Sequence, residues 1–322
     1  MMKNELKLIN MADVVSEKIR WVWYPYIPYG KITIVQGDPG EGKTSFVLGL
    51  VALLTNGQPL PEEKNKNEPI HVIYQTAEDG LADTIKPRLL ASGADCSKVL
   101  VIDESEQELT LCDKRLEQAV KETGAKLIIL DPVQAYLGGN VDMHRANEVR
   151  PIFKRLCLMA EKTGCAIILI GHMNKAQGMK SSYRGLGSID FRAAARSVLV
   201  IGRTKENTNL RIAAHDKSSL APEGKSIAFE LGNECVVRWR GYSNITVDEL
   251  LSGTGSGQTK TTQIETMLRE LLVSPVPANE IFKKANELGI SERTVKIAKK
   301  NIGVISEKVG SRWICSLPKS RV

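Results

Sequence analysis

The sequence predicts an α/β fold with a twisted, mainly parallel sheet, followed by a small domain of helices and a hairpin. Three observations indicate this. Residues 31–240 alternate apolar strand-like runs with helical patterns, which is typical of a wound sheet. A glycine-rich loop joins the first of these runs to a helical pattern. A glycine–serine linker then separates this region from a tail of different character.

The chain is expected to begin with an adaptor segment, residues 1–30, before the α/β core. Two prolines and a cluster of aromatic residues favour an extended segment laid on the core. The aromatic residues are Trp21, Trp23, Tyr24, Tyr26 and Tyr29. We expect the core to span residues 31–245, the linker residues 246–260 and the tail residues 261–322.

Nine apolar runs within the core are predicted to be strands. In chain order they are Lys31–Gln36, His71–Thr76, Lys98–Asp103, Lys126–Asp131, Ala166–Gly171, Ser197–Gly202, Arg211–His215, Ser226–Leu231 and Cys235–Arg240. The last three follow one another too closely for crossover helices to fit between them. We therefore expect them to finish the sheet as an antiparallel meander.

The tail has the pattern of three helices and a hairpin. The helices are Thr261–Leu272, Pro277–Leu288 and Glu292–Asn301, and the hairpin joins Val304–Lys308 to Trp313–Leu317. Gly289 and Gly303 end the second and third helices, and Ser291 is placed to cap the third. Three helices followed by a hairpin form the winged helix-turn-helix plan.

The net positive charge of the 322-residue chain lies almost entirely in the tail. The net charge is +7. Residues 260–322 hold 12 Lys/Arg and 6 Asp/Glu, whereas the rest of the chain holds 32 and 31. This asymmetry predicts a polyanionic partner for the tail. The alternative is a lysine-rich surface that only keeps the protein in solution.

Composition argues against membrane and disulfide-rich classes of protein. No apolar run reaches the roughly 20 residues that span a bilayer, and the N-terminus lacks an apolar signal region. The six cysteines include no C-x-x-C pair and lie mostly in apolar runs. We interpret them as core residues of a cytoplasmic protein rather than as metal ligands or disulfides.

The most informative stretch is the loop Gly37–Thr44, which fits the phosphate-binding pattern G-x-x-x-x-G-K-[ST] without a mismatch. Its glycines let successive N–H groups point at phosphate oxygens, and the helix that follows adds its positive end. Lys43 is predicted to reach the β- and γ-phosphates, and Thr44 to hold Mg²⁺. The residues predicted to bind the nucleotide are Gly37, Asp38, Pro39, Gly40, Glu41, Gly42, Lys43, Thr44 and Ser45.

A nucleotide-hydrolysing site also needs a second carboxylate near the metal ion. Two apolar strands end in aspartate, at Asp131 and at Asp103. Asp131 is favoured because Pro132 ends its strand at once and a loop with two glycines follows. Asp103 opens an acidic stretch and is interpreted as a solvated strand end, so it stays the alternative.

Two further strand ends carry polar residues at the same predicted edge of the sheet. Glu78 follows the second predicted strand and His172 follows the fifth. Because the carboxyl-end loops of parallel strands face one crevice, Glu78 is placed to polarise the attacking water and His172 to hydrogen-bond a phosphate oxygen. The alternatives are that Glu78-Asp79 caps a helix over Gly80–Leu90 and that the histidine is structural.

The loop after His172 is basic. It carries Lys175, Lys180 and Arg184, together with Gly178 and two serines. We predict that these three cations touch a nucleic-acid backbone; a surface loop without a ligand is the alternative.

As a set, these motifs resemble the RecA-like ATPases of the plasmid RepA hexameric helicase type, over about residues 10–240. The matching stretches are Gly37–Thr44, Ala77–Asp79, Leu127–Asp131, Gly171–Lys175, Arg184–Ser188, Ala195–Leu199 and Lys217–Gly224. The resemblance implies a RecA-like P-loop NTPase core that binds ATP and Mg²⁺. It also implies a hexameric ring that moves on nucleic acid during replication of a plasmid, phage or other mobile element. The expected nucleic acid is DNA.

The resemblance assigns roles to five residues of the predicted site. Lys43 and Thr44 bind phosphate and Mg²⁺, and Asp131 is the Walker B acid, which shares the metal ion. Glu78 is the catalytic base, and His172 resembles the phosphate sensor.

In such ATPases a cation from the neighbouring subunit completes the site. Arg192, Arg196 and Lys217 fall in the stretches where this cation lies, and the sequence does not choose among them. For the two arginines, an ion pair on a helix surface is the alternative.

The tail is similar to winged-helix domains that are appended to this family in mobile elements. Its stretch Gly289–Val295 resembles the start of a recognition helix, which would place basic residues near a DNA groove. The predicted contacts are Arg293, Lys296, Lys299 and Lys300. A primase or a replication initiator is a further expected partner. The alternative functions are an ATP-switched DNA-binding regulator or initiator, and a RecA-like recombination or repair mediator.

Overall fold

The computed structural model describes residues 8–139, 141–143, 145–173, 189–204, 207–252, 260–272, 274–287, 290–310 and 312–317. The chain forms two compact units, Met1–Ser252 and Gly253–Val322, and each is described by itself. None of the described helices combines the length and the apolar character that crossing a membrane requires.

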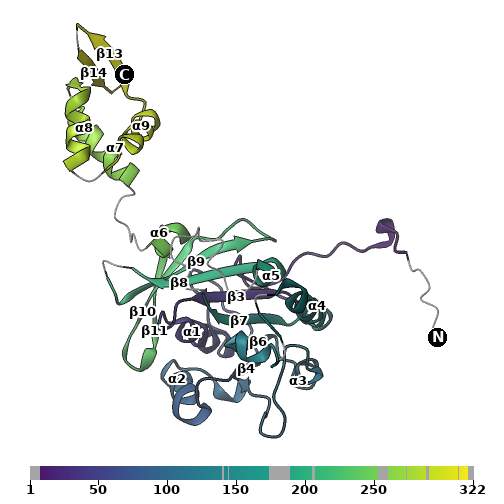
Figure 1. Ribbon diagram of the computed structural model, residues 1–322. Coiled ribbons are helices and arrows are strands. Elements are labelled where there is room, and N and C mark those ends of the chain that lie inside the picture. Colours follow the sequence, from purple (N-terminus) through teal and green to yellow (C-terminus); the bar gives the residue numbers. More distant parts are fainter. Residues whose placement is uncertain are drawn as a thin grey trace. The chain divides into compact units, whose positions relative to one another are not determined.

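A nine-stranded sheet forms the centre of the first unit (Figure 1). Its strands are β3 (Ile32–Gly37), β4 (Val72–Thr76), β5 (Val99–Leu100), β6 (Leu127–Asp131), β7 (Ala166–His172), β8 (Ser197–Arg203), β9 (Leu210–Ser218), β10 (Ser226–Leu231) and β11 (Val237–Ser243). Their order is β11-β10-β9-β8-β3-β7-β6-β4-β5, and the strands from β8 to β5 are parallel. The other three continue the sheet antiparallel to their neighbours, which confirms the predicted meander.

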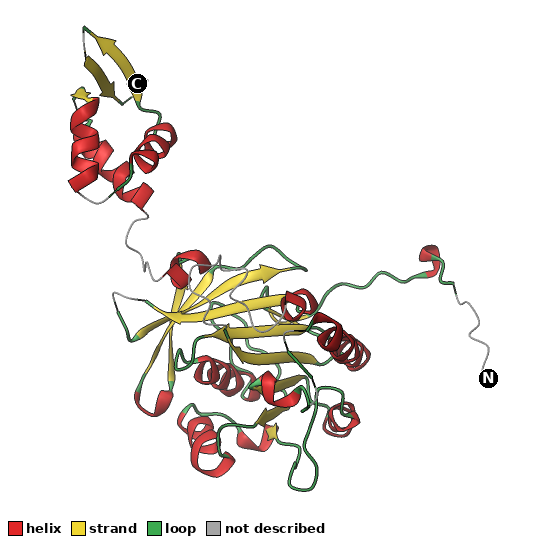
Figure 2. Ribbon diagram, in the orientation of Figure 1, coloured by secondary structure: helices red, strands yellow, loops and turns green. Residues whose placement is uncertain are grey.

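Helices cover both faces of the parallel strands (Figure 2). They are α1 (Lys43–Thr55), α2 (Lys86–Ala91), α3 (Lys114–Thr123), α4 (Ala146–Thr163), α5 (Ile189–Ala194) and α6 (Val247–Ser252). Because successive strand residues point to opposite faces, Val35 packs in one apolar layer with α1 and α2, and Ile34 packs in the other with α3, α4 and α5. The result is the helix-covered, mainly parallel sheet that the sequence predicts.

The strand predicted over Lys98–Asp103 is only two residues long, Val99–Leu100. Beyond Leu100, the backbone of the chain forms hydrogen bonds with a side chain of β4 and not with the backbone of β4. The Gln75 amide oxygen accepts from the Ile102 N–H at 2.6 Å, and the amide nitrogen donates to the Ile102 carbonyl at 3.2 Å. The ladder therefore ends after Leu100, and the following residues form a loop.

The adaptor segment contributes to the core of the first unit. β1 (Trp21–Trp23) and β2 (Ile27–Pro28) form a two-stranded antiparallel sheet. The Trp23 indole N–H donates to the Pro61 carbonyl at 3.2 Å, and the Tyr26 hydroxyl donates to the Lys225 carbonyl at 2.6 Å. Residues 8–20, by contrast, are exposed throughout.

The second unit consists of three helices and a three-stranded sheet. Its elements are α7 (Lys260–Leu271), β12 (Val276–Pro277), α8 (Ala278–Glu287), α9 (Glu292–Asn301), β13 (Ile305–Val309) and β14 (Arg312–Ser316), with β14 between the other two strands. Ile264, Ile281 and Val295 meet in its apolar core. The Ser291 hydroxyl caps α9 by accepting from the Thr294 N–H at 3.3 Å. β12 was not predicted, because two residues are too few to show a periodicity.

A buried histidine ties β9 and β8 to the loop that follows β9. His215 is 6 % exposed. Its Nδ1 accepts a hydrogen bond from the Gly224 N–H at 2.8 Å. The neutral ring therefore carries its proton on Nε2, which donates to the Ser197 hydroxyl at 3.0 Å. Because burial penalises the charged ring, the pKa of His215 is lowered to about 4.

We expect the free energy of unfolding to fall as the pH drops from about 6.5 to about 4. In that range the unfolded chain binds a proton at His215 that the folded chain does not, which favours unfolding by on the order of 3 kcal/mol at the lower end. His215→Gln keeps a donor and an acceptor but does not titrate. Urea unfolding at about pH 7 and about pH 4.5 should show a smaller pH dependence for this variant. Equal pH dependence in both proteins would contradict the prediction.

Candidate active site

The glycine-rich loop lies at the carboxyl end of β3 and leads into α1, a helix buried on nearly all sides. Gly37 is required here because a β-carbon would lie 2.2 Å from the Ile201 carbonyl oxygen of β8. Gly42 precedes α1 with a φ of 89°, a left-handed conformation that glycine adopts without strain. The loop thus turns directly into a helix N-terminus, where backbone N–H groups favour an anion.

Lys43 lies inside this loop. Its ammonium donates to the Asp38 carbonyl at 2.8 Å, and the residue is buried. Burial lowers the pKa of Lys43, and the nearby carboxylates of Asp131 and Glu41 oppose that shift. A lysine held beside a loop of N–H groups at a helix N-terminus is an arrangement suited to phosphate.

Asp131 lies against the glycine-rich loop. β6 and β4 pair in register, so that Asp131 lies beside Thr76 at their carboxyl ends. Oδ2 of Asp131 accepts hydrogen bonds from the Thr44 hydroxyl at 2.7 Å and from the Tyr74 hydroxyl at 2.9 Å. Burial raises the pKa of Asp131, and the two hydrogen bonds act in the opposite direction.

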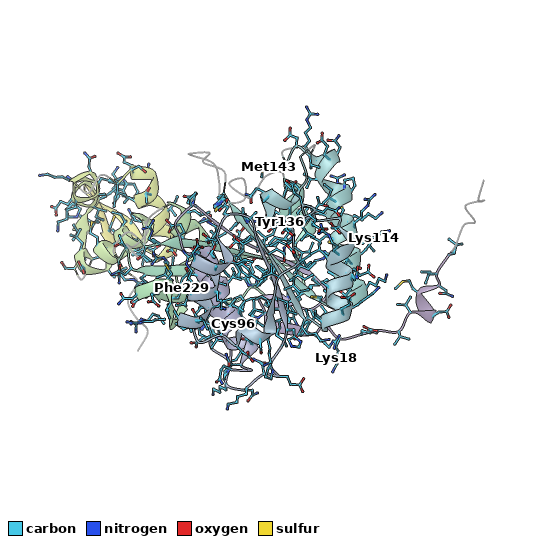
Figure 3. The ribbon with its side chains drawn as sticks, turned by 90° about the horizontal axis from the view of Figure 1, so that it is seen from below. Lys18, Cys96, Lys114, Tyr136, Met143 and Phe229 are labelled. Atoms are coloured by element: carbon cyan, nitrogen blue, oxygen red, sulfur yellow. The ribbon has the colours of Figure 1, made fainter. Side chains whose placement is uncertain are left out.

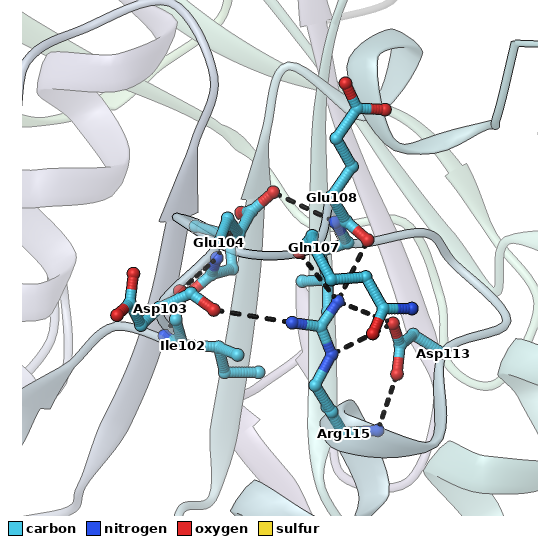
Figure 4. A network of polar contacts seen from close by, with 9 residues as sticks. Ile102, Asp103, Glu104, Gln107, Glu108, Asp113 and Arg115 are labelled. Carbon is cyan, nitrogen blue, oxygen red and sulfur yellow. Dashed lines mark hydrogen bonds and ion pairs between the residues drawn. The ribbon is translucent and has the colours of Figure 1, made fainter.

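Asp103, the alternative to Asp131, lies in a network around Arg115 (Figure 4). Its carboxylate accepts from the Ser105 N–H at 2.9 Å, and its carbonyl accepts from Arg115 at 3.3 Å. Arg115 also pairs with Asp113 at 2.8 Å, so the guanidinium fixes the shape of the loop after β5. The structure therefore places Asp131, and not Asp103, beside the glycine-rich loop.

Glu78 and His172 face each other beside this loop. The Ala77 N–H donates to the Asp131 carbonyl at 3.0 Å, which anchors the turn that carries Glu78. β7 pairs with β3 so that His172 lies beside Gly37. His172 Nε2 is 3.7 Å from Glu78 Oε1, and both side chains are partly exposed. The buried Nδ1 of His172 has no hydrogen-bond partner in the described part of the chain.

Asp79 pairs with a helix instead of capping one. Its carboxylate accepts from Arg88 of α2 at 3.2 Å. The helical segment that follows begins with a π-helical turn, Leu81–Ile85, whose N-cap residue Gly80 offers no capping side chain. This corrects the interpretation in which Asp79 caps a continuous helix.

The three cations expected to act on a neighbouring subunit differ in their surroundings. Arg192 forms an ion pair with Asp216. Lys217 donates to the carbonyls of Arg192 and Ala195, at 2.7 and 2.8 Å, and burial lowers its pKa. Arg196 is exposed, and its guanidinium has no hydrogen bond or ion pair with any described residue. Of the three side chains, that of Arg196 is therefore the one that no described residue engages.

The predicted nucleic-acid contacts fall in two groups. One group lies outside the described residues and consists of Lys175, Lys180 and Arg184, with the side chain of Arg293. The other lies on α9. Lys296 is 3.7 Å from Glu292 and exposed, Lys300 is exposed, and Lys299 donates to the Cys315 sulfur at 3.0 Å. Lys296 and Lys300 thus face solvent, whereas Lys299 is engaged within the unit.

Two arginines that the sequence analysis does not single out flank the glycine-rich loop. Arg203, at the end of β8, forms a two-pronged ion pair with Glu41, with N–O distances of 3.0 to 3.2 Å. Arg211 lies opposite Arg203 on β9, and a β-carbon at Gly42 would be 3.0 Å from its Cδ. Like charges directly opposite each other on a ladder repel, so Glu41 offsets a repulsion that the strand pairing creates.

The chemistry of the site fits a nucleotide with a divalent cation. Mg²⁺ prefers oxygen ligands, and the Thr44 hydroxyl and the Asp131 carboxylate meet at 2.7 Å. The negative charges of Asp79 and Glu78 add to the factors that raise the pKa of Asp131, and a cation would relieve this crowding. Thr44 and Asp131 would hold the ion, while the loop and Lys43 would hold the phosphates.

Tyr74 is a buried member of this site that no sequence motif indicates. The residue is fully buried, and its hydroxyl donates to the same Asp131 oxygen that accepts from Thr44. Burial, and next the charge of Asp131, raise the pKa of Tyr74, so the hydroxyl stays a donor. Tyr74 thus fixes the orientation of the carboxylate.

We expect Tyr74→Phe to weaken Mg²⁺ binding in the presence of nucleotide by about 10-fold or more, because losing a residue that orients a metal ligand typically costs 10–100-fold in metal affinity. The affinity for nucleotide without Mg²⁺ should change little. Titration of Mg²⁺ into the protein with a fluorescent ATP analogue measures both. An unchanged Mg²⁺ dependence would show that Tyr74 only fills space.

Comparison with known proteins identifies a family. Residues 5–178, more than half of the chain, match the AAA domain family. The match includes the glycine-rich loop, Asp131 and His172.

Two curated relatives match a smaller part of the chain. The chain is 27 % identical to the DNA repair protein RadA of Halalkalibacterium halodurans over 148 residues, which is 45 % of this chain. It is 22 % identical to the DNA repair protein RadA of Bacillus subtilis, also over 148 residues. The match spans 28 % of the length of each relative.

The ATPase domain of G40P, a solved structure, shares the fold of the core. The ATPase domain of G40P aligns with a TM-score of 0.51 at 15 % identity, over 66 % of this chain and 85 % of that chain. A KaiC-like protein of Pyrococcus horikoshii aligns with a TM-score of 0.49 at 18 % identity, over 68 % and 95 %. With its mixed, mostly parallel sheet and its glycine-rich loop, the first unit is a RecA-like P-loop ATPase core, and the chain belongs to the AAA domain family.

Proposed function

We propose that the protein is an ATP-hydrolysing, ring-forming motor on nucleic acid, of the kind that serves as a replicative helicase in plasmids, phages or other mobile elements. One observation carries this proposal. Asp131 meets Thr44 beside the glycine-rich loop, and Glu78 faces His172 at the partly open side of the same site. These are the parts that phosphoryl transfer to water requires.

In the proposed reaction, the loop N–H groups and Lys43 bind the triphosphate and orient its γ-phosphate. Thr44 and Asp131 would hold Mg²⁺, which when bound neutralises charge on the phosphate oxygens. Glu78 orients the attacking water and takes its proton. His172 contacts a γ-phosphate oxygen and, being 3.7 Å from Glu78, links the presence of that phosphate to the position of the base.

Arg196 is the residue that we propose to complete the site of a neighbouring subunit. Ser197 pairs with Thr33 near the start of β3, whereas the glycine-rich loop begins at Gly37. Four strand residues span about 13 Å. Arg196 therefore lies near the amino ends of the parallel strands, whereas the phosphate loop of its own chain lies at their carboxyl ends. A guanidinium in that position serves a phosphate only in another subunit.

We propose further that the second unit is a winged helix that binds DNA through α9. Lys296 and Lys300 are exposed on this helix, and the tail carries most of the net positive charge. The curated relatives are named DNA repair proteins, which also supports a DNA substrate. Such a motor would act in the cytoplasm beside a primase or a replication initiator.

A strand-displacement assay tests the function. A forked DNA duplex with one labelled strand is incubated with the protein, ATP and Mg²⁺, and the wild type is expected to release that strand. Lys43→Ala is the matched control and should release none. Protection of a single duplex sequence without any ATP-dependent release would overturn the motor and favour a DNA-binding regulator.

The relatedness to DNA repair protein RadA favours a second candidate, a recombination or repair mediator that coats single strands. Electron micrographs with an ATP analogue and single-stranded DNA separate the two candidates. The motor should appear as closed rings, and the mediator as filaments that lengthen with the DNA.

A further inference from the structure

One large aromatic side chain of the second unit lies at the surface. The chain has five phenylalanines and four tryptophans, nine in all, and each of them is a described residue. Phe229, labelled in Figure 3, is fully buried and packs against Phe46 and Trp239. Of the nine, only Trp313 is exposed, at 55 %. Because tryptophan is highly buried on average, the indole of Trp313 is a candidate contact for a ligand.

The pairing of β13 with β14 sets the direction of this side chain. Trp313 lies directly opposite Lys308, and Cys315 lies opposite Ser306. Opposite residues, and residues two apart on one strand, share a face of the sheet. At Cys315 this face is turned toward the helices, because Cys315 is buried in the core of the unit and accepts a hydrogen bond from Lys299 of α9 at 3.0 Å.

The helices no longer cover this face at Trp313. The turn end of the hairpin extends beyond the helices of the unit in Figure 1, and both Trp313 and Lys308 are exposed there. The indole therefore lies on the side of the hairpin that faces α9, at the point where that side opens to solvent.

The surroundings of the exposed indole are basic. Lys308 is its partner across the strands. α9 supplies further cations, since Lys299 reaches Cys315, which is two strand residues or about 7 Å from Trp313. Lys300 follows on α9 and is exposed. An aromatic ring among cations suits a ligand that combines flat rings with phosphate groups, and a nucleic acid is such a ligand.

Stacking on an indole requires a base with an open face. Inside a duplex, neighbouring bases cover both faces of each base, whereas the first unpaired base beside a duplex offers a face to a protein side chain. We propose that Trp313 stacks on this first unpaired base, so that the second unit binds the junction between double-stranded and single-stranded DNA. α9 holds phosphates of the duplex, and Lys308 holds those of the unpaired strand.

The inference rests on the proposed function in one respect, the binding of DNA by α9. It adds the DNA structure that the second unit recognises and the residue that recognises it. A motor that opens a duplex creates this junction at every step, so a unit of this kind would keep its chain at the opening point.

A fluorescent base tests the stacking. The adenine analogue 2-aminopurine, whose emission falls when it stacks, is placed at the first unpaired position of a forked duplex. At protein concentrations that saturate the DNA, the full-length wild type should lower this emission, and Trp313→Ala should leave it unchanged. Trp313→Phe keeps an aromatic ring and should lower the emission in part. Equal lowering by Trp313→Ala and the wild type would overturn the proposal.

Ile305 provides a matched control on the same hairpin. It is 44 % exposed and lies opposite Ser316, on the other face of the sheet from Trp313. Trp313→Ala should bind the fork about 10-fold more weakly than the wild type, whereas Ile305→Ala should bind it as tightly. A relaxed, closed circular duplex has no unpaired base, so both variants should bind it like the wild type. For Trp313→Ala, no loss on the fork, or an equal loss on both DNAs, would contradict the junction.

The failures of the two proposals are distinguishable. A wild type that displaces a strand with ATP, while Trp313→Ala lowers the emission as the wild type does, retains the motor and loses the stacking. A protein that lowers the emission through Trp313 but displaces no strand loses the motor and retains the stacking.

Discussion

The Glu78→Gln protein is expected to bind ATP as tightly as the wild type and to hydrolyse it at least about 100-fold more slowly. Glutamine has nearly the shape of glutamate but cannot accept the proton of the attacking water. The phosphate-binding parts, which are the glycine-rich loop and Lys43, remain unchanged by this substitution. Steady-state phosphate release measures the turnover, and a fluorescent ATP analogue measures the binding.

The neighbouring residue provides the control for Glu78. Asp79 is also a carboxylate at the end of β4, but it is paired with Arg88 of α2. Asp79→Asn should therefore keep turnover within a few-fold of the wild type, whereas Lys43→Ala should lose both binding and turnover. Full activity of Glu78→Gln would remove that residue from the role of base. Equal losses in Glu78→Gln and Asp79→Asn would point instead to a general effect of charge.

The parts of the site that the sequence predicts are those encoded within a short stretch of chain. The loop from Gly37 to Thr44 follows an apolar run and precedes a helix, so its pattern and its context are local. Asp131 is likewise recognisable as the end of an apolar strand followed by proline. The sequence favours Asp131 over Asp103 because of the residues that follow each one. The hydrogen bond from Thr44 now places Asp131 in the site.

The parts that the sequence does not predict depend on pairing between distant segments. In the sequence, Tyr74 is not distinguished from the other residues of a predicted apolar strand. Only the pairing of β4 with β6 brings its hydroxyl to Asp131. Arg203 is 162 residues from Glu41 and reaches it because β8 lies beside β3. The early end of β5 has the same kind of cause, since a side chain of β4 replaces the backbone as the partner of Ile102.

The cation that we propose to act on a neighbouring subunit is a further part of the site that the sequence alone does not identify. The sequence offers Arg192, Arg196 and Lys217 as equals, because all three are cations in similar stretches. Their contacts separate them. Arg192 is paired with Asp216, and Lys217 donates to carbonyls at the end of α5. These two residues are engaged within their own subunit, and for this reason we propose Arg196 for the role.

The Arg196→Ala protein is expected to bind ATP normally and to lose about 10³-fold or more in turnover, the usual effect of removing an arginine finger. Its guanidinium has no hydrogen bond or ion pair among the described residues, so folding should be unaffected. Arg192→Ala is the contrasting variant. It removes an ion pair with Asp216 and should lower the melting temperature, an effect that Arg196→Ala should not share.

Mixing two inactive proteins decides whether Arg196 acts between subunits. Arg196→Ala has an intact phosphate loop but no cation to donate, whereas Lys43→Ala cannot bind phosphate but keeps its Arg196. In a mixed ring, a Lys43→Ala subunit can complete the site of an Arg196→Ala neighbour, so turnover should reappear when the two are combined. A double variant that carries both substitutions on one chain should restore nothing. If the mixture stays as inactive as its components although mixed rings form, Arg196 does not serve the neighbouring site, and the proposed role is wrong.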